Sequence, residues 1–253
     1  MSHTAYTLGL ASVSFRQHTP EEILQVMRAV GLTCVEWGAD IHAPCHDTAR
    51  LREIATLQET YGISCSSYGT YFRLGEMPIH ELEASIAAAH MLNTTVLRLW
   101  CGSKNGEAMT AEEREVLLQD CRIAASMAEK HGVTVCLECH RNTFTERIRD
   151  AVWLMETINS PHFRMYWQPF QWQTVAENLD NARAIAPYAE HLHVFHWQGD
   201  RRLPLTDAIP DWRGYLQAFS TPRTLLLEFM PTNTIEELAV ETAALKTIVE
   251  GDR

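Results

Sequence analysis

Basic residues are scarce in this sequence of 253 residues, where 21 lysines and arginines stand against 32 aspartates and glutamates. The formal net charge of -11 argues against a nucleic-acid partner, which would require a basic face. There is no run of about 18 apolar residues that could span a membrane. The start, MSHTAYTLGL, also lacks the basic and apolar regions of a signal peptide. We therefore expect a cytoplasmic protein without a membrane partner, and the sequence leaves a homo-oligomer open.

The cysteines do not suggest a disulfide framework or a zinc site. Seven are scattered along the chain, an odd number in a sequence long enough to form its own core, so we expect reduced thiols. Cys136 and Cys139 form a lone CxxC in a predicted strand, where residues three apart face opposite sides. The chain also lacks linkers and low-complexity tracts, and we expect residues 1–253 to form a single domain.

Short apolar or β-branched segments alternate with helical patterns, which is the rhythm of a parallel α/β protein. The predicted strands are residues 6–15, 34–38, 64–71, 95–102, 134–140, 164–169, 192–197 and 224–229. A doubly wound sheet would usually carry a glycine-rich loop after its first strand, and LGLASVSFRQ has none. Eight strand–helix units therefore predict an α/β fold, a single (β/α)8 TIM barrel.

Helix boundary signals support this alternation. Capping boxes are predicted to begin helices at Thr19, Thr110 and Thr234, and helix C-caps are predicted at Gly31, Gly62 and Gly132. The longest predicted helix covers residues 111–131, and the seventh, residues 212–219, is short. The long loop before it, residues 198–210, is predicted to be a lid or substrate loop.

Polar residues occupy the ends of four consecutive predicted strands. They are Glu138, Gln168, His193 and Glu228, and the alternation of strand faces directs Glu138, His193 and Glu228 into the barrel mouth, where active sites of this fold lie. A lone strand-end glutamate could equally be a buried ion pair. These side chains lie at the same level along the barrel axis and offer two carboxylates, an imidazole and an amide oxygen. Such a set of ligands predicts one divalent ion, either Mn2+, Mg2+, Co2+ or Zn2+.

Other residues near the strand ends are candidates for contacting a substrate. The predicted substrate-binding residues are Arg98, Trp100, His140, His196 and Arg202. For Arg98 a structural role, a salt bridge to Glu36 or Glu138, is an equally supported interpretation. Trp37, Trp100, Trp167 and Trp197 are candidates for walls of a sugar pocket, although ordinary packing is the favoured interpretation for each one.

The motifs together resemble the xylose-isomerase-like TIM-barrel superfamily of sugar and sugar-phosphate isomerases and epimerases. The segments that carry the resemblance are VEWGADIH at 35–42, LECHRNT at 137–143, YWQP at 166–169, HLHVFH at 191–196 and LLEF at 226–229. The resemblance implies a metal site formed by Glu138, Gln168, His193 and Glu228, in which Gln168 replaces the family's usual aspartate. Gln171 stands where the epimerases often have a substrate-binding histidine.

The resemblance implies proton transfer at a carbon next to a carbonyl through an enediolate, with Glu138 and Glu228 as the two catalytic bases. The first interpretation is therefore a metal-dependent isomerase or epimerase of a small sugar or sugar phosphate. The alternatives are a lyase that dehydrates a keto-polyol, a hydrolase, and a non-catalytic sugar-binding barrel. The acidic charge argues against an apurinic endonuclease, and the lack of a carboxylate at the end of the fourth strand argues against a glycosidase.

Overall fold

The structure, a computed structural model, describes residues 6–220 and 223–250, and its centre is a closed barrel of eight parallel strands. The start of the chain, from which no signal peptide is expected, lies partly outside the described residues. Around the barrel the strands follow the order β1-β10-β7-β6-β5-β4-β3-β2. The strands are β1 Thr7–Ala11, β2 Cys34–Gly38, β3 Ser64–Leu74, β4 Val96–Cys101, β5 Thr134–Glu138, β6 Phe163–Trp167, β7 Ala189–Val194 and β10 Thr224–Leu227. The predicted TIM barrel is confirmed.

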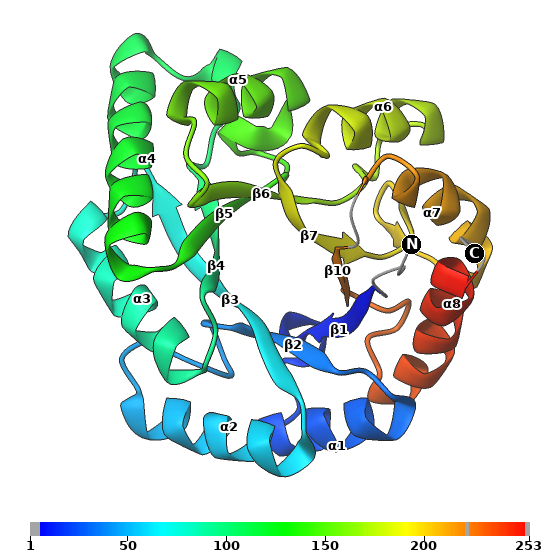
Figure 1. Cartoon of the computed structure of the whole chain (residues 1–253). Helices are drawn as coiled ribbons and strands as arrows, with labels where there is room; N and C mark the ends of the chain where they lie inside the picture. Colours follow the sequence, from blue (N-terminus) through cyan, green and yellow to red (C-terminus); the bar gives the residue numbers. More distant parts are fainter. Residues whose placement is uncertain (1–5, 221–222, 251–253) are drawn as a thin grey trace.

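Eight helices form a ring outside the strands (Figure 1). They are α1 Pro20–Val30, α2 Thr48–Tyr61, α3 Leu82–Met91, α4 Ala111–His131, α5 Ile148–Ile158, α6 Val175–Ile185, α7 Ile209–Leu216 and α8 Leu238–Glu250. Their buried faces pack against the sheet in one continuous apolar core. Within the described part of the chain, none of these helices has the length and apolar character needed to cross a membrane.

Local capping explains where several helices begin. The predicted boxes at Thr19 and Thr110 are both present, and Thr174 forms a third box that the sequence analysis missed. The predicted box at Thr234 is wrong. Its side chain caps nothing there, because Glu237 instead accepts a hydrogen bond from the Thr232 amide across a short 3-10 turn. Gly31, Gly62 and Gly132 adopt the predicted left-handed C-cap conformation.

Small and apolar side chains fill the barrel interior beneath its mouth. Cys34, Cys136, Tyr166 and Leu226 form this inner cluster, separate from the core between sheet and helices. Gly9 leaves the room they need, since a Cβ there would lie 2.5 Å from Cys34 Sγ and 2.9 Å from Leu226. The barrel is therefore closed below, and polar groups collect at its carboxyl end.

Two segments differ from the sequence prediction in ways that shape the mouth. The first predicted strand ends early, at Ala11, and the chain continues as a 3-10 helix, η1 Ser12–Phe15. The loop 198–210 is not irregular throughout, because β8 Trp197–Gln198 and β9 Arg201–Arg202 form an antiparallel hairpin. The 3-10 helix η5 Leu205–Ala208 then leads into α7, which begins three residues before the predicted start.

Candidate metal centre and substrate pocket

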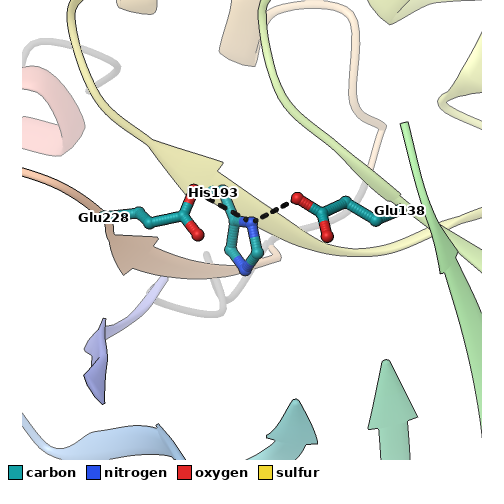
Figure 2. Close-up of side chains that lie close together, drawn as sticks. All are labelled: Glu138, His193 and Glu228. Carbon is teal, nitrogen blue, oxygen red and sulfur yellow. Dashed lines mark ion pairs between the residues drawn. The ribbon is translucent and has the colours of Figure 1, made fainter. Parts of the chain in front are cut away.

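Three residues predicted from separate strands converge at the barrel mouth (Figure 2). Glu138 ends β5, His193 lies on β7, and Glu228 directly follows β10. His193 Nδ1 lies 3.7 Å from Glu138 Oε1 and 3.4 Å from Glu228 Oε2. One ligand atom from each residue lies within 4.8 Å of the others, and all three residues are buried. This spacing suits donors shared by one ion.

Gln168 joins the cluster from the neighbouring strand. It directly follows β6, and its Oε1 lies 3.0 Å from His193 Nδ1. The same imidazole nitrogen therefore faces two carboxylates and one amide oxygen. The structure thus brings together all four predicted ligands.

A buried ion pair supports the cluster from the β2–β4 side. Arg98 Nε donates to Glu36 Oε1 at 2.9 Å, and Arg98 Nη1 donates to Glu138 Oε2 at 2.5 Å. Both salt bridges that the sequence offered as alternatives for Arg98 are therefore present. Gly69 on β3 makes space for this contact, because an added Cβ would lie 2.8 Å from both Arg98 Nη2 and Glu36 Oε1.

The charges of the cluster favour a divalent cation. Glu36, Glu138 and Glu228 are three buried carboxylates, and Arg98 supplies one buried guanidinium, which leaves two negative charges to be balanced. His193 Nε2 lies 3.5 Å from Glu36 Oε1 without a hydrogen bond, and the negative charge of this carboxylate favours a proton on Nε2. Nδ1 then faces the oxygen atoms of Gln168, Glu138 and Glu228. The residues present therefore fit a single divalent ion.

The same electric field shifts the pKa values of the cluster. Burial opposes the charged form of His193, but the charges of Glu228 and Glu36 outweigh it and raise the pKa of the imidazole to about 10. Burial likewise opposes ionisation of Glu36, while Arg98 and His193 lower its pKa to about 2. Burial raises the pKa of Glu228. A cation that takes Nδ1 would therefore displace a proton from His193.

A cavity of about 200 Å3 opens directly above these groups. The residues predicted as ligands or substrate contacts that line it are Arg98, Trp100, Glu138, His140, Gln168, Gln171 and Glu228. His140 Nδ1 lies 2.7 Å from the carbonyl oxygen of Arg141 and donates a hydrogen bond to it, which leaves Nε2 outside this contact. Its ring stacks on Trp100 at 4.7 Å, and Trp100 Nε1 donates to Glu138 Oε2 at 2.8 Å.

The remaining predicted contacts lie at or beyond the rim. Arg202 stands 4.9 Å from the rings of both Trp197 and Phe229, beside the cavity. His196 does not line this cavity, and its Nδ1 contacts the carbonyl oxygen of Pro204 at the base of the hairpin. Among the four tryptophans, Trp100 and Trp197 line the cavity, whereas Trp37 and Trp167 are fully buried in the core.

One charged group at the mouth was not predicted from the sequence. Arg16 follows η1 and lines the cavity, held by Asp40 and by the hydroxyl of Tyr71. Phe229 also lines it and adopts a left-handed conformation (φ 54°), with its amide donating to Ser14 Oγ at 2.9 Å. A non-glycine residue in this conformation beside Glu228 is the kind of backbone outlier found at functional sites.

Comparison with known proteins agrees with this architecture. The model of the xylose isomerase-like TIM barrel family matches residues 24–242. The chain belongs to this family. The resemblance inferred from the strand-end motifs is therefore confirmed.

Proteins that are similar to this chain have different activities. A 3-dehydroshikimate dehydratase of Bacillus anthracis is 23% identical over 119 residues, which are 47% of this chain and 42% of that relative. The chain thus spans less than half the length of this curated relative. The crystal structure of the probable 3-DHS dehydratase of petrobactin synthesis from B. anthracis has a TM-score of 0.78 at 18% identity, with 96% of this chain and 99% of the other covered. D-Psicose 3-epimerase from Clostridium cellulolyticum, solved with D-tagatose, has a TM-score of 0.65 at 14% identity, with 97% and 95% covered.

Proposed function

We propose that this family member is a divalent-metal-dependent enzyme that removes a proton from the carbon next to a carbonyl in a small keto-polyol, as an isomerase or epimerase does. The observation that carries the proposal is the convergence of Glu138, His193 and Glu228 beneath the cavity at the barrel mouth. A divalent ion held by these residues and Gln168 would act as a Lewis acid for the negative charge that develops on the substrate oxygen.

The two predicted bases differ in the hydrogen bonds that they accept. Glu138 Oε2 accepts from both Arg98 and Trp100, which stabilises its anion and fixes its position. Glu228 has no such donors among the described residues apart from His193, and it lines the cavity. We therefore assign proton removal first to Glu228. Glu138 holds the site together, and its role as a second base stays a prediction.

Dehydration is a second candidate, favoured by the position of His140. A protonated imidazole beside the cavity could give its Nε2 proton to a departing hydroxyl while Glu228 takes the carbon-bound proton. The carbon–oxygen bond breaks, a carbon–carbon double bond forms, and water leaves. The similarity to a 3-dehydroshikimate dehydratase supports this alternative.

Proton exchange in D2O tests the proposal. Mn2+-loaded protein is incubated with ketoses, their phosphates and 3-dehydroshikimate, and the loss of carbon-bound protons is followed by NMR. Glu228→Gln and Glu138→Gln should each reduce exchange about 100-fold or more, because each amide lacks the basic oxygen. A higher Mn2+ concentration should partly restore proton exchange in Glu138→Gln but leave Glu228→Gln inactive.

The products separate the two candidate reactions. Exchange without loss of water, together with a new ketose, supports isomerisation or epimerisation, whereas ultraviolet absorbance of a conjugated product supports dehydration. Full activity in both glutamine variants would contradict the proposed roles of these glutamates.

A further inference from the structure

Arg16 presents a prepared anion-binding edge to the cavity. Its Nε donates to Asp40 Oδ2, its Nη1 to the Val13 carbonyl at 3.2 Å, and its Nη2 to the Tyr71 hydroxyl at 2.6 Å. The Tyr71 hydroxyl donates in turn to Asp40 Oδ2 at 3.0 Å. These partners fix the plane of the guanidinium and lower the entropy lost when a ligand binds.

Two donors on Arg16 remain for a ligand. Each terminal nitrogen carries two N–H groups, and only one on each has an acceptor among the residues that the structure describes. Arg16 lines the cavity, and its side chain is 42% exposed. A fork with one free donor on each terminal nitrogen matches the two oxygens of a carboxylate.

The charge of the mouth points to a substrate with one negative charge. A divalent ion would neutralise the cluster of Glu36, Glu138, Glu228 and Arg98, and Asp40 neutralises Arg16. The positive charge of Arg202 is then left without a counter-charge, because Arg202 forms cation–π contacts but no ion pair within residues 6–220 and 223–250. The hairpin holds this uncompensated positive charge at the rim, close enough to interact with Glu228.

We propose that the substrate is a monoanionic hydroxy-keto acid whose carboxylate binds Arg16, rather than a neutral sugar or a sugar phosphate. This inference rests on the proposed function, which concerns the keto and hydroxyl groups that react. It adds a carboxylate at the other end of the substrate. The cavity of about 200 Å3 suits a molecule of single-ring size and is below the roughly 300 Å3 at which pockets for larger ligands begin. A phosphate dianion would exceed the single positive charge available.

A pair of probes of the same shape tests the carboxylate subsite by binding alone. Mg2+-saturated protein is titrated calorimetrically with 3,4-dihydroxybenzoate and with 3,4-dihydroxybenzamide, whose neighbouring oxygens imitate a keto-hydroxy pair. Wild type should bind the benzoate at least about tenfold more tightly, because only the benzoate places anionic oxygens against the two free N–H groups of Arg16, close to the unpaired charge of Arg202. Arg16→Met should remove this preference while leaving benzamide affinity within about twofold.

A second arginine provides a matched control for lost charge. Arg141 lines a separate, larger cavity between the β5–α5 and β6–α6 loops, and it stacks on Trp172 at 4.3 Å. Arg141→Met should retain the benzoate preference. Equal binding of both probes by wild type, or a preference that survives in Arg16→Met, would overturn the proposal. Because this measurement involves no turnover, a benzoate preference together with unaffected exchange in Glu228→Gln would reject the proposed reaction and keep the subsite.

Discussion

Gly69 is the residue whose size matters most directly to the polar cluster. Its missing side chain lets Glu36 and Arg98 meet beside β3, in a place where any Cβ would lie 2.8 Å from both partners. The pair is fully enclosed, so neither charge could turn to water if the contact opened. An added methyl group at this position would therefore disturb the ion pair and, through Arg98, the position of Glu138.

Gly69→Ala is expected to lower the free energy of unfolding by about 1–3 kcal/mol, the usual cost of overpacking. It should also weaken metal binding, because Arg98 would no longer hold both glutamates in place. Gly214→Ala is the matched control, since Gly214 lies in α7 and an added Cβ there meets nothing within 4 Å. Urea unfolding of the two variants checks the prediction, and equal stability would show that the ion pair accommodates a methyl group.

At the scale of elements, α8 anchors the hairpin that carries Arg202. The carboxylate of Glu241 accepts the Leu205 amide at 3.1 Å, at the start of η5 and three residues after β9. Burial raises the pKa of Glu241 to about 7, with Glu237 and Asp207 adding to the rise and the Leu205 amide opposing it. The contact that positions the hairpin therefore involves a group that ionises near neutral pH.

The raised pKa predicts a definite dependence of stability on pH. Between the ordinary pKa of 4.5 and about 7, the folded state binds the Glu241 proton more strongly than the unfolded state does, so this contribution to stability falls as pH rises. From pH 5 to pH 8 the wild type should lose on the order of 1–2 kcal/mol relative to Glu241→Gln, which keeps the acceptor and cannot ionise. Urea unfolding at several pH values measures the difference, and parallel profiles for the two proteins would contradict it.

At the scale of the whole molecule, the sequence predicted the barrel and the convergence of Glu138, His193 and Glu228. Both follow from periodicity, because parallel strands end at one face and alternate residues point inward. Arg16 was missed because the pattern of residues 6–15 resembles a strand throughout, whereas the chain turns into η1 and brings Arg16 over the mouth. The hairpin was missed because two-residue strands leave no periodic signal. Arg98 could not be assigned from sequence, since its partners depend on distances across the barrel.

The central claim is that Glu138, Gln168, His193 and Glu228 hold one divalent ion, and calorimetric titration of metal-stripped protein with Mn2+ tests it most directly. Wild type should bind about one ion per chain and gain thermal stability on binding, since an ion that binds only the folded state stabilises it. Glu228→Ala should abolish both effects, and Gln168→Asp should tighten binding by adding an anionic ligand. If Gln168→Asp has no effect while Glu228→Ala removes the ion, Gln168 is not a ligand. If wild type binds no ion, or Glu228→Ala binds it as tightly as wild type does, the claim is contradicted.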